Sequence, residues 1–312
     1  ELQAQKERSR NAAAVDTDDW VELFPIRESL FTGYDTLTEQ VRIARYRRVT
    51  SKGKTSYQLV FDRTPFYGNS GGQVGDIGTI VGDGFEIEVT DTKKKLDGLW
   101  VHVCKMLNGS VRKGTFASFR VNEENRHAIE ANHTVTHLLH HALQEKFGAS
   151  VTQKGSMVAA DKMRFDIAYP KQISEPEIRD LENAVNRLIR ANLPVHTNIM
   201  NQEDAIKAGA MALFGEKYGD EVRVVCVGDG VSMELCGGTH VKQTGSIGYF
   251  NIVSESAIAA GVRRLECVTG TAAEKFTQDI EDRLHRVGAC LKAGFNDIEN
   301  RVVQLLEEKK KL

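Results

Sequence analysis

Two short histidine motifs, about a hundred residues apart, carry the residue types in this chain that are best suited to chemistry. The first, HTVTH, occupies residues 133–137, and the second, CGGTH, occupies residues 236–240. Three imidazoles and one thiolate form a ligand set that zinc binds tetrahedrally, provided that folding brings the two motifs together. The motifs therefore predict one Zn²⁺ per chain. Its ligands would be His133, His137, Cys236 and His240.

The first motif lies on a predicted helix. Apolar residues at helical spacing predict this helix over residues 123–147, and a glycine follows its end. The apolar residues form a stripe that should pack on the core, whereas His133 and His137 fall together on the opposite side. For HTVTH alone, a polar solvated face is the alternative interpretation. The glycine pair of CGGTH permits a bend that turns both of its ligands toward one point, and the two motifs together favour a metal.

The ligand set fits either a structural or a catalytic zinc. Four protein ligands are typical of a closed structural site, whereas a catalytic zinc usually keeps one position for water. A weakly held fourth ligand would reconcile this set with catalysis. No glutamate follows His133, which excludes the HExxH arrangement of metalloproteases. Cys226 and Cys267 lie in apolar runs with strand character and are predicted to be core residues instead of ligands.

Composition limits the class of protein. The chain has 312 residues, of which 41% are hydrophobic and 27% charged, as in a globular protein large enough for two cores. Its formal net charge of −2 argues against a general polyanion binder, so a nucleic acid would need a local basic patch. Basic residues are densest between Arg42 and Lys54, where a solvated strand face is an equally good interpretation.

The cellular setting is predicted from what the sequence lacks. Five cysteines at irregular spacing do not resemble a disulfide framework, and no run is apolar enough for a membrane helix. We therefore expect a cytoplasmic protein without a membrane partner. The chain begins with Glu1 and ends in a charged helical run, so we expect it to be a piece of a longer protein.

The order of strand and helix patterns predicts an α+β fold. A polar, helix-prone stretch and an acidic loop come first, followed by short runs with strand character and glycine turns, which predict a small β-barrel. Helical patterns, one opened by a capping box from Ser174 to Glu177, then share a region with further strand runs, which predicts helices packed on a sheet. A helical tail follows. The four predicted parts are residues 1–31, 32–120, 121–270 and 271–312.

Six segments together resemble the editing half of alanyl-tRNA synthetases, in the order that this family shows. Each segment alone is weak evidence for the family, and together the segments cover roughly residues 30–270. The segments are residues 64–67 leading into 71–78, 132–139, 153–156, 164–166, 236–240 and 261–266. The flanks resemble the end of the tRNA-recognition helices with a linker, and the start of the C-terminal helical region. The class II ATP-binding motifs of the aminoacylation half are missing from this sequence.

The resemblance implies a function and a set of site residues. In this family the editing domain hydrolyses the ester of tRNA(Ala) mischarged with serine or glycine. The resemblance implies a zinc editing site at the four predicted ligands, with Gln153 and Thr134 as candidate catalytic residues that position the aminoacyl group. It also implies that the glycine-rich loop of residues 71–78 closes over the pocket. The candidate substrate-binding residues are Gly71, Gly72, Gln73, Asp76 and Arg263.

Physical chemistry makes these assignments reasonable and also supplies alternatives. A pocket for alanine rejects an added hydroxyl by only about a hundredfold, so a second site that hydrogen-bonds the serine hydroxyl is useful. Against this, Thr134 can simply bond a backbone carbonyl, Gln153 can lie on the surface, and the glycines can be barrel turns. Arg263 and Arg264 should point to opposite faces of a strand, where one can pair with Asp166 or Glu266.

The expected partner is tRNA(Ala), bound through its aminoacylated 3′ end and acceptor stem, while the oligomeric state stays open. The favoured interpretation is a zinc-containing aminoacyl-tRNA deacylase region without the aminoacylation domain. Two alternatives are an RNA-binding fragment with a purely structural zinc and a free-standing trans-editing protein.

Overall fold

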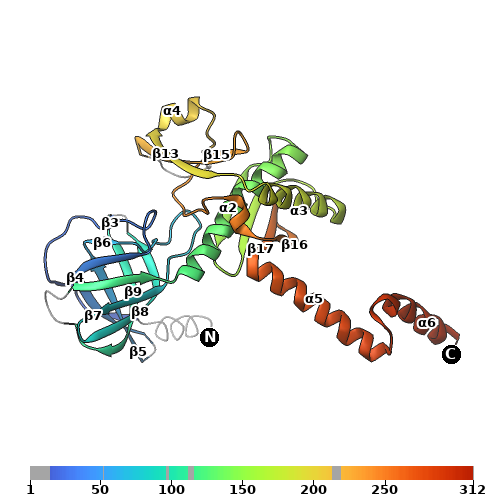
Figure 1. Cartoon of the computed structure of the whole chain (residues 1–312), viewed down its shortest axis with the longest axis horizontal. Helices are drawn as coiled ribbons and strands as arrows, with labels where there is room; N and C mark the ends of the chain where they lie inside the picture. Colours follow the sequence, from blue (N-terminus) through green and yellow to red (C-terminus); the bar gives the residue numbers. More distant parts are fainter. Residues whose placement is uncertain (1–14, 52, 96–97, 112–115, 213–218, 312) are drawn as a thin grey trace, which may run out of the picture.

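The computed structural model describes residues 15–51, 53–95, 98–111, 116–212 and 219–311. The helix-prone stretch expected near the N-terminus lies outside these residues. The fold is a mixed α+β fold with several antiparallel sheets, as predicted (Figure 1). Within the described residues, no helix is long and apolar enough to cross a membrane.

A ring of six antiparallel strands forms the barrel, because strand β5 pairs with both β4 and β9. Side chains alternate along its strands: Phe85, Ile87 and Val89 of β8 are buried, and the glutamates between them face outward. The strands of the ring, in spatial order, are β4 (Thr38–Ser51), β10 (Phe116–Val121), β7 (Gly78–Gly82), β8 (Phe85–Lys94), β9 (Trp100–Gly109) and β5 (Lys54–Phe61).

Short strands flank the barrel. Strands β1 (Val15–Thr17) and β2 (Val21–Glu22) both pair with β4, and β3 (Leu30–Phe31) pairs in parallel with β6 (Arg63–Thr64). The chain around β2 covers part of the basic cluster of β4. Arg45 forms an ion pair with Glu22, Arg48 pairs with Asp18, and the guanidinium of Arg47 lies 4.5 Å from the ring centre of Trp20. Much of this basic cluster is therefore used within the chain.

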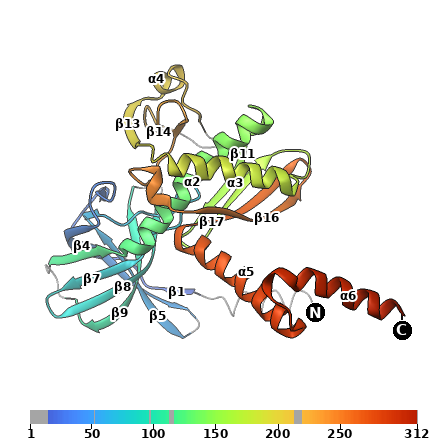
Figure 2. The same cartoon turned by 45° about the vertical axis from the view of Figure 1, so that its right-hand side comes forward.

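The second part is a four-stranded antiparallel sheet with two helices packed on it (Figure 2). Its strands, in spatial order, are β11 (Gln153–Val158), β12 (Met163–Ala168), β17 (Val262–Thr269) and β16 (Phe250–Ala259). The helices are α2 (Glu123–Phe147), which has its predicted bounds, and α3 (Glu175–Arg190). The predicted capping box of α3 is confirmed, since Glu177 accepts a hydrogen bond from the backbone N–H of Ser174.

Three further segments complete the described chain. A small sheet of β13 (Val195–Asn201), β14 (Glu221–Val227) and β15 (Ser232–Leu235) packs with α4 (Gln202–Lys207) around its own apolar cluster. The 3₁₀ turn η1 (Thr244–Ile247) precedes β16. Helices α5 (Gly270–Leu291) and α6 (Ile298–Lys311), joined by η2 (Phe295–Asp297), project away from the body (Figure 1). Strand β16 begins at Phe250, shortly after the turn η1.

Helix α2 is buried on both sides through its middle. Its apolar stripe, including Val135, Leu138 and Leu139, lies in the core on the sheet, as predicted. The opposite side, with His133 and His137, is also buried, so the interpretation of a solvated polar face was wrong. The loop after β15 and the glycine-rich loop of the barrel cover that side through the contacts described below.

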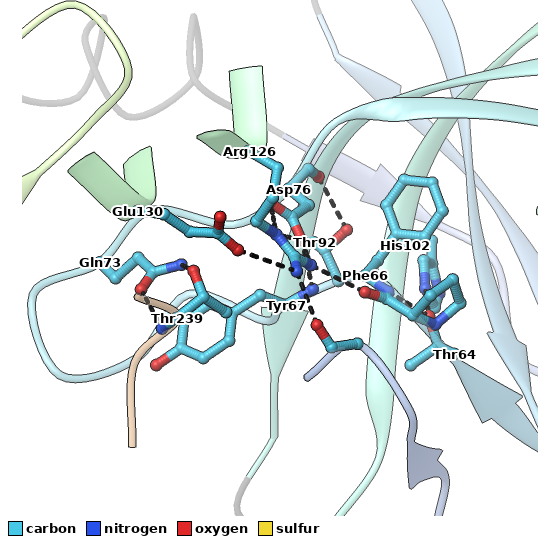
Figure 3. A network of polar contacts seen from close by, with 12 residues as sticks. Thr64, Phe66, Tyr67, Gln73, Asp76, Thr92, His102, Arg126, Glu130 and Thr239 are labelled. Carbon is cyan, nitrogen blue, oxygen red and sulfur yellow. Dashed lines mark hydrogen bonds and ion pairs between the residues drawn. The ribbon is translucent and has the colours of Figure 1, made fainter. Parts of the chain in front are cut away.

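A buried ion pair joins the first turns of α2 to the barrel (Figure 3). Arg126 and Asp76 each have side chains that are 1% exposed, and both oxygens of the carboxylate accept hydrogen bonds from the guanidinium. The same guanidinium donates to the carbonyl oxygens of Gly33 and Pro65, and Asp76 also accepts the N–H of Tyr67. Every member of this buried network has several partners, which offsets the cost of removing the charges from water.

We expect Asp76→Asn to destabilise the chain by about 3–5 kcal/mol, because it leaves the buried charge of Arg126 without a counter-charge. Urea unfolding followed by circular dichroism measures this loss. The matched control is Asp83→Asn, an exposed aspartate in a turn of the same barrel. Equal unfolding midpoints for the two variants would show that the ion pair does not contribute to the stability of the chain.

Candidate metal centre

Helix α2 and the loop after β15 bring the four predicted ligands to one point. The ligand atoms of His133, His137, Cys236 and His240 all lie within 4.8 Å of one another. His133 and His137 stand on successive turns of α2 with nearly parallel rings, 5.9 Å apart at their centres. The Cys236 Sγ atom lies 3.4 Å from Nε2 of His133 and 3.3 Å from Nε2 of His240. The two motifs converge as predicted.

Each histidine of this cluster has a different partner at its Nδ1 atom. Nδ1 of His133 lies 2.7 Å from the amide oxygen of Gln73. Nδ1 of His137 lies 2.9 Å from the carboxylate of Glu234, and Nδ1 of His240 lies 3.2 Å from the hydroxyl of Thr134. The amide oxygen of Gln73 can only accept, so Nδ1 of His133 carries the hydrogen in that bond, whereas Nδ1 of His137 faces the carboxylate of Glu234 as an ion-pair contact. The hydroxyl of Thr134 already donates to the Glu130 carbonyl, so it too accepts from imidazole.

This arrangement leaves the Nε2 lone pairs of His133 and His240 for a shared cation. A metal-bound histidine ordinarily donates its other ring nitrogen to an oxygen, which fixes the tautomer and the orientation of the ring. Both ring nitrogens of His137 are buried without a hydrogen-bond partner among the described atoms; Nδ1 faces the carboxylate of Glu234, whereas Nε2 is left orphaned. A buried nitrogen with a free lone pair is costly unless something binds it. The donor set and this orphaned atom both fit a zinc ion.

The charges of the cluster also favour a bound divalent cation. Burial opposes a thiolate at Cys236, but His133 and His240 beside it hold the pKa of that thiol well below its usual range. Burial also opposes a charge on His137, yet the neighbouring Glu234 raises the pKa of this imidazole to about 10. The cluster thus gathers two buried anions, Cys236 and Glu234. Protons on the imidazoles or a divalent cation can balance them, and metal binding would release those protons.

Close backbone approach explains why glycines flank the ligands. A Cβ atom on Gly238 would collide with the ring of His133, so the CGGTH loop reaches the helix only without a side chain at that position. Gly72 has a positive φ of 82°, and a Cβ there would press on Ser156 of β11. The backbone of the glycine-rich loop pairs with β11 on both sides of Gln73, through Val158.

Gln73 makes the barrel part of the metal centre. Its side chain is completely buried and spans two segments that are distant in sequence. The amide oxygen accepts from the backbone N–H of Thr239 at 3.0 Å as well as facing His133, and the amide nitrogen donates to the Thr239 hydroxyl at 2.9 Å (Figure 3). Because a backbone N–H can only donate, it fixes which end of the amide faces His133.

A cavity of about 70 Å³ opens beside the cluster. Three of the ligands line it, together with two predicted site residues, Gly71 and Gln153. Gln153 is half-buried at the start of β11, and its amide nitrogen lies 3.5 Å from the hydroxyl of Ser156, which also lines the cavity. Gln153 is therefore not simply a surface residue.

The other predicted site residues lie elsewhere. Thr134 is fully buried and bonds the Glu130 carbonyl, which was the structural alternative, while also facing His240. Asp76 belongs to the ion pair with Arg126. Arg263 pairs with Glu255 on the neighbouring strand. None of these three residues lines the cavity, and their contact with a substrate stays a prediction.

Three residues that were not predicted from the sequence support the loop of residues 236–240, here called the metal loop. Glu234 is 2% exposed and faces both His137 and His140. Arg223 donates to the carbonyl oxygens of Cys236 and Gly238, and its own carbonyl accepts from the Cys236 N–H.

The third missed residue is Tyr34, whose hydroxyl donates to the carbonyl of Gly237 at 2.6 Å. Only the position of Glu234, two residues before Cys236, was a usable sequence signal. Of the two arginines, Arg264 pairs with Asp166, as one of them was expected to do.

Comparison with known proteins agrees with this picture. A family model described as the threonyl and alanyl tRNA synthetase second additional domain matches residues 222–266, which include CGGTH. A model described as tRNA synthetases class II (A) matches residues 1–125, whose described part is mainly the barrel.

Several alanine–tRNA ligases are similar to nearly the whole chain. The chain is 47% identical to that of Mesorhizobium japonicum over 307 residues, covering 93% of this chain and 35% of the relative. It is also 47% identical to that of Sinorhizobium medicae, covering 90% of this chain and 33% of the relative. The chain thus spans about a third of the length of the curated relatives it matches. It is a region of the alanyl-tRNA synthetase type with the second additional domain, and the resemblance predicted from its motifs is confirmed.

We expect Gln73→Leu to lower the affinity for zinc by about tenfold to a hundredfold, the usual cost of losing a partner of a ligating histidine. Competition with a chelating dye measures the affinity, and Gln40→Leu on the exposed face of β4 is the matched control. Equal zinc affinities in the two variants would show that Gln73 does not orient His133.

Proposed function

We propose that the chain hydrolyses the ester bond of tRNA(Ala) mischarged with serine or glycine, in the cavity beside the four-ligand cluster. One observation carries this proposal: His133, His137 and Cys236 line the same cavity as Gln153 and Ser156. A small space between a cation site and hydrogen-bonding side chains suits an aminoacyl ester, which has one polarised carbonyl and one short polar side chain.

The residues present would hold zinc through three imidazole nitrogens and one thiolate. When bound, such an ion supplies either polarisation of a carbonyl or a lower pKa for a neighbouring water. The chain's own groups fix the ligand geometry, since Gln73, Glu234 and Thr134 each hold one imidazole. An aminoacyl ester is already activated, so placing it correctly beside a water contributes much of the acceleration.

The size of the cavity supports a small aminoacyl group. The volume of about 70 Å³ is far below the roughly 300–1,000 Å³ of ordinary small-molecule sites. A space this small suits a glycyl or seryl group better than a large side chain. Gln153 and Ser156 offer hydrogen bonds that a serine hydroxyl can satisfy and an alanine methyl cannot. For the seryl ester, the cavity thereby selects on the hydroxyl that alanine lacks, which an alanine-sized synthetic pocket cannot do well.

A second candidate function is RNA binding around a purely structural zinc. It is favoured by the number of protein ligands, because four such ligands are typical of closed sites. Both candidates require the metal, and only the first requires release of the amino acid.

We expect the purified chain to release serine from Ser-tRNA(Ala) much faster than alanine from Ala-tRNA(Ala), and Cys236→Ala to lose both zinc and activity. The readouts are the release of radiolabelled amino acid and metal analysis. Cys290→Ala, which removes an exposed cysteine of α5, is the matched control and should keep both. Serine release no faster than in buffer, from a chain that contains zinc, would leave the RNA-binding candidate.

We expect Gln153→Ala to retain zinc and to lower kcat/KM for Ser-tRNA(Ala) by about tenfold, the effect of one lost hydrogen bond worth roughly 1.4 kcal/mol. The control is Gln172→Ala, an exposed glutamine after β12. Loss of metal from Gln153→Ala would mean that this residue supports the cluster and does not contact the substrate.

A further inference from the structure

An aromatic cluster lies next to the metal centre on its barrel side. Phe31 packs edge-on against Tyr34, with ring centres 4.9 Å apart, and stacks on Trp100 at 5.6 Å. Its edge also meets Tyr67 at 5.9 Å, and Tyr67 lines the small cavity beside the ligands. These rings come from β3, β9 and the loops that follow β3 and β6, so they form a wall shared by the barrel and the site.

Within this cluster, Tyr34 is both exposed and held in place. The residue is 44% exposed, although its hydroxyl donates to Gly237 and one face of its ring lies 4.1 Å from the guanidinium of Arg223. Arg223 is itself fixed by the carbonyl oxygens of Cys236 and Gly238. An aromatic ring that is already immobilised loses little conformational entropy when a flat ligand stacks on it.

Tyr34 connects two spaces of different size. Its hydroxyl bonds Gly237, which lines the cavity of about 70 Å³, while the residue itself lines a second cleft of about 480 Å³. His240, the fourth member of the ligand cluster, also lines that cleft. The smaller space is far below the range of small-molecule sites, roughly 300–1,000 Å³, and the larger lies within it. Only the cleft has room for a nucleoside.

The chemistry of the cleft fits a nucleotide. Lys242 and His127 line it and can face a phosphate, and Asp35 and Thr36 offer oxygen acceptors to base or ribose donors. Aromatic rings bind single-stranded nucleic acids by stacking on a base, without requiring a particular sequence. Among the residues that line this cleft, Tyr34 supplies a phenol ring, and the residue is 44% exposed.

We propose that Tyr34 is the stacking platform for the 3′-terminal base of the aminoacylated RNA. The terminal nucleoside occupies the larger cleft, and the aminoacyl group that it carries reaches past Gly237 into the small cavity. This proposal rests on the proposed function, because it names where the nucleotide part of that substrate binds. It adds a subsite made by the barrel part of the chain to a site whose other residues lie mainly on α2 and the metal loop.

The test uses the full chain and an uncharged hairpin RNA with the acceptor stem of tRNA(Ala), in which 2-aminopurine replaces the terminal adenine. Stacking on an aromatic ring quenches this base, so a fluorescence titration gives both binding and environment. We expect quenching by the wild-type chain and a Kd about fivefold to a hundredfold weaker for Tyr34→Ala, as for the loss of one stacked base. Tyr249→Ala, also 44% exposed but outside the cleft lining, is the matched control and should bind like the wild type.

Tyr34→Phe separates stacking from support of the metal loop, because it keeps the ring and loses the hydrogen bond to Gly237. Near-normal binding and quenching by Tyr34→Phe, with equal zinc content in all variants, supports the proposal. Equal binding by Tyr34→Ala and wild type overturns it, as does a Tyr34→Phe variant that is as impaired as Tyr34→Ala.

Hydrolysis of Ser-tRNA(Ala) is measured separately, since the fluorescence titration needs no catalysis. Quenching that depends on Tyr34 without any hydrolysis would overturn the deacylase and support the base subsite. Normal kcat and KM in Tyr34→Ala would overturn the subsite while leaving the deacylase in place.

Discussion

The buried ion pair between Arg126 and Asp76 fixes how helix α2 leaves the barrel, and the metal centre depends on that placement. Residues four, seven and eleven positions after Arg126 lie on the same side of a helix, and here they are Glu130, His133 and His137. Holding the first turns against the barrel therefore turns both histidines toward the glycine-rich loop and the CGGTH loop. The same polar side of α2 thus serves first as an anchor and then as a ligand face.

No single segment of the chain supplies the whole metal centre. Helix α2 supplies two imidazoles, the loop after β15 supplies a thiolate and a third imidazole, and the barrel supplies Gln73. Two anions, Cys236 and Glu234, lie in the same buried volume. A divalent cation balances their charge without requiring a proton on any imidazole, so metal binding and correct folding of this region are thermodynamically linked.

Much of the fold was predictable because local patterns specify it. The alternation in β8, the helical stripe of α2 and the capping box of α3 each follow from residues close together in the sequence. Strands β11, β12, β13 and β15 were not identified, since their short and partly polar runs resemble loops without their pairing partners. The small sheet around β14 has a separate apolar cluster that no local pattern indicated.

The sequence by itself determined the ligand types, their two motifs and the helix that carries the first of them, because residue chemistry and short-range spacing are written directly in the chain. Only the tertiary structure decided what the polar neighbours do. Gln73 contacts His133, which is 60 residues away in the sequence, and Thr239, which is 166 residues away. Asp76 and Arg126 are 50 residues apart in the sequence. Such hydrogen bonds depend on burial and orientation, which arise when distant segments pack together and leave no local pattern in the sequence.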